Sequence, residues 1–182
     1  MSSIAHYLFQ QNAPIIHLGE LASITNGNAD VQDAIDNYEA GLYPFFDRSE
    51  QIKYLSRFYL DKAAIIYAGE GQNFLPRYFE GKFALHQRCY AIYDFDTRII
   101  PRYCYHYMHQ LNKYFQKTAV GSTVASLRMD NFLNAPIKIP SIVMQEYISN
   151  VLDSVEDIKI VEQRLLSNYI LQRKYLVSKL FT

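Results

Sequence analysis

The C-terminal stretch SIVMQEYISNVLDSVEDIKIVEQRLLSNYILQRKYLVSKLF, residues 141–181, contains neither glycine nor proline. Apolar residues recur along it in mixed steps of three and four, a spacing typical of one face of a helix. Ser141 is the expected N-cap, although Met144 stands where the acid of a capping box would be. The stretch predicts one long amphipathic helix. Its apolar stripe consists of Ile148, Leu152, Val155, Ile158, Leu165, Tyr169, Leu176 and Leu180.

The length of this helix raises the question of what covers its apolar stripe. At about 1.5 Å per residue, residues 148–181 would span on the order of 50 Å, more than a small domain can cover. A second long helix is the natural partner, as in a coiled coil. The alternative is a helix that folds back onto its own domain.

Composition fits one ordinary domain, residues 1–140, followed by this helix, residues 141–182. Apolar residues make up 49% of the 182 and charged residues 20%, which excludes an intrinsically disordered chain. Two cysteines, Cys89 and Cys104, are too few for a disulfide framework. Residues 1–11 lack a basic region and a long apolar core, and no apolar run approaches about 18 residues. We expect a cytoplasmic protein without a membrane span.

The rest of the chain alternates short candidate elements and predicts an α+β fold with a mixed or antiparallel sheet. Periodicity predicts a helix over residues 29–40, and Pro101 is expected to open another. Apolar and β-branched runs predict an edge strand over 42–46 and further strands over 63–68, 83–95 and 135–139.

A formal net charge of zero hides a basic middle. Residues 1–47 hold six acids and no Lys or Arg, whereas residues 48–128 hold twelve basic and six acidic residues interleaved with tyrosines. Such a surface is suited to binding the phosphates of a nucleic acid. The alternative is a Tyr-rich core with a solvated charged face. The candidate DNA contacts are Arg57, Lys62, Gln72, Asn73, Arg77, Lys82, Arg88 and Arg128, of which Gln72, Asn73 and Arg77 suit base edges.

The order of motifs resembles the specificity, or DNA-recognition, subunit of type I restriction–modification enzymes. The motifs are Leu18-Gly19-Glu20-Leu21-Ala22, Gly41-Leu42-Tyr43-Pro44-Phe45, Ile65-Ile66-Tyr67-Ala68-Gly69, Leu85-His86-Gln87-Arg88-Cys89, Gly121-Ser122-Thr123, Ile137-Lys138-Ile139-Pro140 and Gln145-Glu146-Tyr147-Ile148. The full subunit of that family has two recognition domains, each followed by a long helix, and this chain resembles half of one.

The resemblance implies a non-catalytic reader of double-stranded DNA that works with methyltransferase subunits and, through them, restriction subunits. An antiparallel homodimer would place one recognition domain at each end of the helix pair. The implied target is a bipartite sequence with inverted halves and a non-specific spacer. No cofactor is implied.

Other functions remain as alternatives at this stage. Asp61 with Glu80-Gly81-Lys82 could hold Mg²⁺ in a nuclease, but Asp61 precedes a predicted strand and the other three predict a turn. Cys104, His106 and His109 could form a metal site on one helix face. Gly69-Glu70-Gly71 lacks the third glycine of a nucleotide fingerprint. A protein-interaction module without DNA binding is the remaining alternative.

Overall fold

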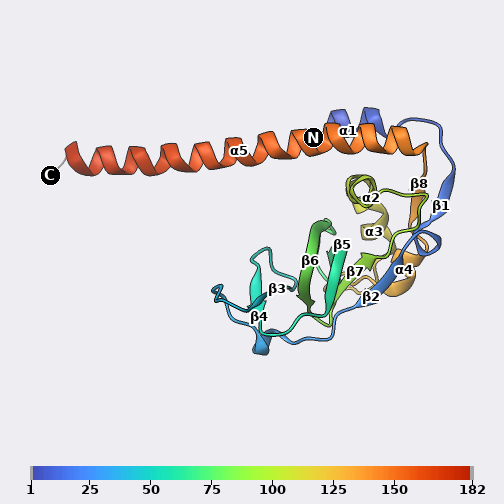
Figure 1. Ribbon diagram of the computed structural model, residues 1–182, viewed down its shortest axis with the longest axis horizontal. Helices are drawn as coiled ribbons and strands as arrows, with labels where there is room; N and C mark the ends of the chain where they lie inside the picture. The colour runs from blue at the N-terminus through green and yellow to red at the C-terminus, as the bar shows by residue number, and fades with distance from the viewer. Residues whose placement is uncertain (1, 181–182) are drawn as a thin grey trace.

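The computed structural model describes the backbone of residues 2–180 and the side chains of residues 4–179. A curved sheet is covered by short helices on one face, and one long helix runs across the top of the domain and past it (Figure 1). The sheet has six strands, in the order β2 (Ser23–Asn26), β7 (Cys89–Tyr93), β5 (Leu60–Ala68), β6 (Arg77–Leu85), β3 (Tyr43–Phe46) and β4 (Lys53–Leu55).

The pairing makes this sheet mixed, as the sequence predicts. β3 and β6 are parallel, and the other neighbouring strands are antiparallel. A separate two-stranded sheet pairs β1 (Ile15–His17) with β8 (Pro136–Lys138). The helices are α1 (Ser2–Leu8), α2 (Pro101–Met108), α3 (Asn112–Thr118), α4 (Met129–Leu133) and α5 (Ile142–Leu180), with short 3-10 turns at Leu18–Glu20, Val31–Asp33 and His109–Leu111. No helix within residues 2–180 is long and apolar enough to cross a membrane.

The central strand β5 is buried on both faces, because its side chains alternate between two cores. Ile65 and Tyr67 point into the larger core, under α2, α3 and α4, whereas Ala64 and Ile66 point into a smaller one on the other face. The Tyr67 ring packs against Phe132 in the larger core at a centroid distance of 5.3 Å. Aromatic packing therefore joins the sheet to its helical cover.

Two predicted elements differ in the structure. Of the helix expected over residues 29–40, only Val31–Asp33 forms a turn, capped by the Asp30 carboxylate, which accepts from the Gln32 amide. Beyond it the backbone of Ile35 exchanges two hydrogen bonds with Tyr54, at 3.0 and 2.9 Å, so sheet pairing replaces the helix.

The strand expected over residues 83–95 is two strands, β6 and β7, which lie on opposite sides of β5. Residues 86–88 carry the chain from one to the other, and there the His86 amide donates to the Phe46 carbonyl. Gly27 is required beside this crossing, since an added Cβ would lie 2.1 Å from the Leu85 carbonyl oxygen. The predicted strand over 42–46 is β3, which lies between β6 and β4 and is therefore not an edge strand.

The long helix is present, and it has two different halves. The Met144 amide donates to Ser141 Oγ at 3.4 Å, so Ser141 caps it as predicted. Ile148 and Leu152 are each only 1% exposed and belong to the larger core of their own domain. Beyond Asp157 the side chains described are exposed. The first turns therefore fold back on the domain, as one of the two sequence-based expectations has it. The rest of the helix is uncovered in this chain, and its pairing with a second long helix stays a prediction.

Candidate nucleic-acid interface

The eight candidate DNA contacts lie at opposite ends of the β5–β6 ribbon. Arg57, Lys62 and Lys82 are near the start of β5, where Lys62 pairs with Asp94 and Lys82 lies over the Phe58 ring. The others lie at or near the end of β5, about 27 Å away for a strand of nine residues. The structure therefore does not join the eight into one surface.

The loops beyond the end of β5 form a polar surface, which we call the loop surface. It comprises residues 47–53, 70–73, 87–88 and 116–128. Two adjoining hollows on it share Gly71 and Val124 in their walls. Backbone bonds hold its segments together, because the Gly71 amide donates to Ala125 and the Leu127 amide donates to Gly69.

Basic and amide side chains project from the loop surface. Glu70 sits between Arg48 and Arg88, and its carboxylate accepts from their guanidinium groups at 2.6 and 2.9 Å. Both arginine side chains stay more than half exposed, so each keeps donors free for a phosphate. Arg128 is also exposed. Sequence reasoning missed Arg48, whose signal was its position as the first basic residue after the acidic N-terminal region.

Amide groups supply a second kind of contact on the same surface. Gln72 and Asn73 are exposed in the loop between β5 and β6. Gln116 of α3, another residue that the sequence did not single out, donates to the Gln72 carbonyl at 2.9 Å and to Asn73 Oδ1 at 3.2 Å. The loop between β5 and β6 is therefore fixed to α3, while the Gln72 side chain remains available to contact a ligand.

Arg77 is a correction to the predicted site. Its guanidinium Nη1 donates to the Ser49 carbonyl at 2.8 Å, Nη2 donates to the Asp47 carbonyl, and the group lies over the Phe46 ring. Because these contacts occupy it inside the domain, Arg77 positions the loop at 47–49 and is not presented to a base edge.

Asp47 completes the base of that loop. Burial would raise the pKa of its carboxyl group, but hydrogen bonds from Ser49 and the nearby Lys53 ammonium outweigh burial, and the pKa is lowered. Asp47 is therefore ionised at neutral pH. The carboxylate is tied to the Ser49 amide at 2.6 Å, so the loop that carries Arg48 is anchored at both ends of its turn.

We expect Arg77→Ala to loosen this loop and leave the rest of the fold intact. The two carbonyls would lose a charged donor, at a cost of about 1.5–3 kcal/mol. Hydrogen exchange of residues 47–52 should accelerate. Arg57→Ala removes an exposed pair with Asp33 and is the matched control. Equal exchange in the two variants would contradict this role.

Half-buried ionic groups join α2 to α5 on the side of the domain away from the loop surface. Arg102 Nε donates to Asp153 at 3.0 Å and Nη2 to Glu156 at 3.2 Å, while the buried His106 lies 2.6 Å from Asp153. Tyr105 donates its hydroxyl to Glu156 at 2.7 Å. We call this group of five side chains the joint, because it fixes where α5 leaves the domain.

The proposed metal ligands are not brought together. Cys104 is fully buried, and burial raises the pKa of its thiol, so it is not a thiolate. His106 instead lies with Asp153 and Glu156, whose ligand atoms are within 4.8 Å of one another. The Arg102 guanidinium already lies across both carboxylates, where a cation would bind.

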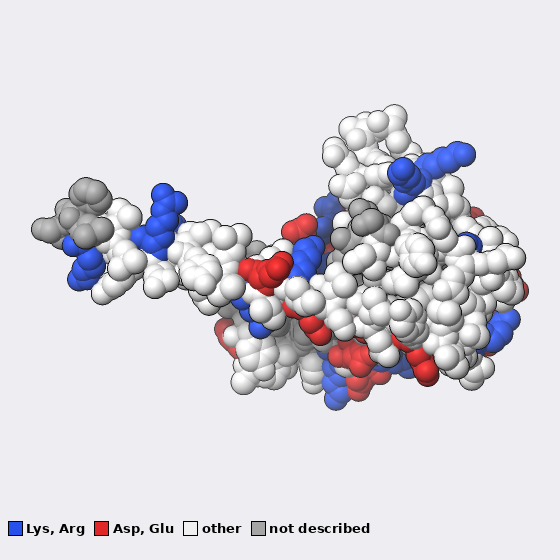
Figure 2. All heavy atoms as spheres, turned by 90° about the horizontal axis from the view of Figure 1, so that it is seen from above, with Lys and Arg blue, Asp and Glu red and all other residues white. Residues whose placement is uncertain are grey.

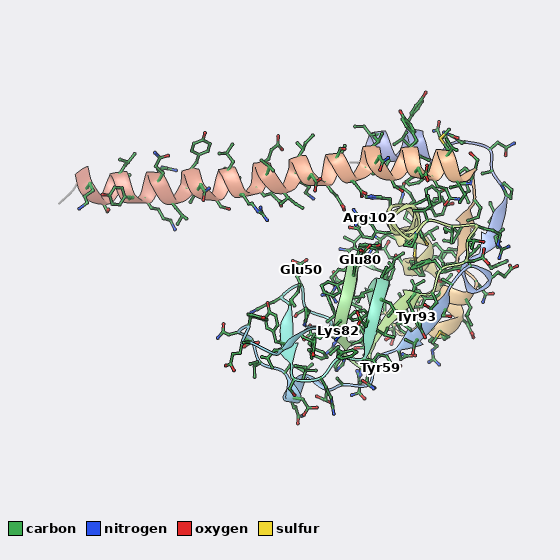
Figure 3. The ribbon with its side chains drawn as sticks, in the orientation of Figure 1. Glu50, Tyr59, Glu80, Lys82, Tyr93 and Arg102 are labelled. Atoms are coloured by element: carbon green, nitrogen blue, oxygen red, sulfur yellow. The ribbon has the colours of Figure 1, made fainter. Side chains whose placement is uncertain are left out.

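The nuclease residues are placed differently from the prediction. Asp61 lies within β5 and residues 80–82 lie within β6, not in a turn, and Asp61 is directly opposite Lys82. Figure 3 places Glu80 near Arg102 below α5, while Lys82 lies farther away, toward Tyr59. Glu80 accepts from the Tyr78 hydroxyl. Among the described side chains these residues do not form a three-ligand metal cluster.

Comparison with known proteins identifies solved structures that have this fold. Solved structures with the same fold include a type I restriction–modification system S subunit from M. genitalium (TM-score 0.69, 16% identity, 82% of this chain and 40% of that one). The HsdS subunit from Thermoanaerobacter tengcongensis gives a TM-score of 0.62 at 14% identity, over 86% of this chain and 40% of that one. A structure of a type I R-M system gives a TM-score of 0.67 at 16% identity, over 96% of this chain and 47% of that one.

This chain thus spans less than half the length of each of these proteins. Among curated protein sequences no relative matches it. Residues 12–167 match the family described as type I restriction modification DNA specificity domain. Since that match covers most of the sequence, the chain belongs to the type I restriction–modification DNA specificity family.

Proposed function

We propose that the chain is a sequence-specific DNA-recognition subunit that binds duplex DNA through its loop surface. The observation that carries the proposal is the convergence of exposed Arg48, Arg88 and Arg128 with the amides of Gln72 and Asn73 on anchored loops. Arginines bind phosphates and guanine edges, and amides pair with adenine edges. Methylation and cleavage are left to other subunits, which the family context supplies.

The second part of the proposal is dimerisation through the exposed half of α5. Ile158, Leu165, Tyr169 and Leu176 are 48–59% exposed there, and a second copy of the helix would bury them. Charge favours the antiparallel arrangement. From residue 163 to 179 the helix carries Arg164, Arg173, Lys174 and Lys179 without an acid, whereas Glu146, Asp157 and Glu162 lie nearer the domain.

The same separation of charge is visible in the space-filling view. In Figure 2 the end of α5 farthest from the domain shows only Lys and Arg among its charged residues, and acidic residues begin closer to the domain. In an antiparallel pair the basic C-terminal part of each helix would lie against the acidic N-terminal part of the other. In a parallel pair, segments of like charge would lie side by side. Such a dimer would read two inverted half-sites and offer the helix pair to methyltransferase and restriction subunits.

The dimer seam differs from the predicted stripe at two residues. Ile148 and Leu152 belong to the predicted stripe, but they are covered by their own domain and are omitted from the seam. Val155 is half-buried at the boundary. The side chain of Leu180, the last predicted member of the stripe, lies outside the described residues.

Salt-dependent DNA binding tests the loop surface. Replacing Arg48, Arg88 and Arg128 together by Ala should weaken binding to all duplexes and reduce the salt slope by about one for each phosphate that is no longer bound. The matched control replaces Arg57, Lys62 and Lys82, which removes the same charge at the other end of β5. If both triple variants bind DNA equally weakly, binding depends on the overall positive charge and not on the loop surface. A wild-type chain that binds no DNA at low salt would favour the protein-interaction module instead.

A further inference from the structure

The acidic residue Glu70, just beyond the end of β5, is built into the framework of the loop surface. On one side of it the Gly69 amide donates to the Arg88 carbonyl at 2.9 Å, and on the other the Gly71 amide donates to the Ala125 carbonyl at 3.0 Å. An added Cβ at residue 69 would lie 2.4 Å from the Arg88 carbonyl oxygen, so glycine permits this close approach. The Glu70 side chain is only 19% exposed. Its carboxylate is therefore held in a fixed place.

One carboxylate oxygen of Glu70 serves each of two arginines. Oε2 accepts from Nη1 of Arg48, and Oε1 accepts from Nη1 of Arg88. Arg48 comes from the loop between β3 and β4, whereas Arg88 comes from the crossing between β6 and β7. A guanidinium group has five N–H donors, of which Glu70 takes one from each arginine. Because both arginine side chains are more than half exposed, their other donors can meet a ligand.

The shared carboxylate changes which acceptor these donors favour. Two guanidinium groups and one carboxylate leave a single positive charge, and the nearby Asp47 and Lys53 offset each other at 3.2 Å. A phosphate at the outward donors would bring a second anion within one guanidinium group of Glu70, where the two negative charges repel. A guanine edge in the major groove offers two acceptors, O6 and N7, and carries no net charge. The arrangement therefore favours guanine over phosphate.

We propose that Glu70 is a positioning residue for sequence recognition, which orients Arg48 and Arg88 toward guanine edges and weakens their contacts with phosphates. This inference rests on the proposed function, because it takes duplex DNA as the ligand of the loop surface. Arg128 is exposed and forms no ion pair with the described side chains, so its charge is not offset and it suits a phosphate. The loop surface then holds DNA with one kind of arginine and reads it with another.

A simple tether is the competing role for the same contacts. Glu70 ties the loop that carries Arg48 to the end of β5. A tether alone predicts that its loss loosens the loop and weakens binding to every duplex. A positioning carboxylate predicts the opposite for DNA without guanine, because its loss leaves two arginines whose full charge binds phosphates. The direction of the change separates the two roles.

Binding of Glu70→Gln to two duplexes of equal length provides the test. One is the duplex that the wild-type chain enriches most from a random-sequence pool, and the other is an alternating A–T duplex, which contains no guanine. Glutamine keeps the size of the side chain and removes its charge. We expect the variant to bind the A–T duplex about fivefold more tightly at low salt, with a salt slope steeper by about one. Its preference for the selected duplex should fall about tenfold.

Glu50→Gln is the matched control. Glu50 is an exposed acid of the same loop as Arg48, and it forms no ion pair with a described arginine. Its removal changes the net charge equally, so binding to both duplexes should change alike and the preference should stay that of the wild type.

A second measurement needs no protein variant. Replacing guanine by 7-deazaguanine in the selected duplex deletes the N7 acceptor and leaves every phosphate in place. The wild-type chain should bind this duplex about tenfold more weakly.

The outcomes separate this inference from DNA binding itself. Equal wild-type binding to the guanine and 7-deazaguanine duplexes would overturn the role of Glu70 and leave the loop surface standing as a DNA-binding site. The same holds if Glu70→Gln binds both duplexes more weakly with an unchanged preference, since Glu70 would then be a tether. A wild-type chain that binds no duplex at low salt would overturn the proposed function.

Discussion

A chain in which Leu165 and Leu176 are both replaced by Asp is expected to be monomeric. The two side chains are 48% and 52% exposed in a single copy, so the substitutions leave the domain's own core unchanged. In a dimer they would put four carboxylates into an apolar seam. Each carries a desolvation cost of several kcal/mol, so we expect dimerisation to weaken at least roughly a hundredfold. Sedimentation velocity over a concentration series measures this.

The control adds the same charges on the opposite side of the helix. Ile160 and Ser167 lie about 140–180° around α5 from Leu165 and Leu176, at 100° per residue. Ile160→Asp with Ser167→Asp should therefore leave the dimer intact. If the seam variant keeps its helical circular dichroism and still sediments as a dimer, the exposed stripe is not the interface.

The stripe of α5 illustrates what periodicity alone does not reveal. Helical spacing places Ile148, Val155 and Leu165 on one face, and in the structure they share one helix. The pattern says which side chains share a face, but it does not say what covers that face. Because α2 packs against the start of α5, Ile148 lies in the domain core while Leu165 is exposed.

Elsewhere tertiary pairing overrides local preference. Residues 29–40 have helical spacing, but the Ile35 backbone pairs with Tyr54 instead of with its own next turn. Arg77 resembles a base reader because it follows a glycine-rich loop. Its partners, the carbonyls of Ser49 and Asp47, are 28 and 30 positions away, and no local pattern predicts such an interaction.

The predictions that the structure confirms rest on strong local signals. Proline at Pro101 opens α2, Ser141 caps α5, and residues 63–68 form most of the central strand. The motif order that carries the family resemblance is likewise a property of the sequence. The loop surface was only half predictable, since Gln72 and Arg88 stood out but Gln116 depends on how α3 packs.

The second large effect is a loss of stability at low pH. It is expected to arise from His109, which lies at the end of α2 beside the joint. Burial lowers the pKa of His109 to about 4, although Glu156 opposes this and His106 and Lys159 add to it. Its Nε2 atom is buried without a hydrogen-bond partner. Burial likewise lowers the pKa of His106, despite its contact with Asp153. Both histidines are therefore neutral in the folded protein at pH 7.

The sign of the pH dependence follows from proton binding. An unfolded histidine takes up its proton near pH 6.5, whereas folded His109 does so only near pH 4. Between these values the unfolded chain binds more protons, so the free energy of unfolding falls as pH falls through this window. The loss from His109 alone is on the order of 3 kcal/mol, and His106 acts in the same direction.

Urea denaturation at pH 7 and pH 4.5 measures this loss, and His109→Phe should reduce it most. Phenylalanine keeps an aromatic ring beside Tyr105, whose centroid lies 4.9 Å away, and brings no buried nitrogen. His6→Gln, at an exposed histidine of α1, is the matched control variant. An unchanged pH dependence in His109→Phe would mean that His109 protonates at no cost to the fold.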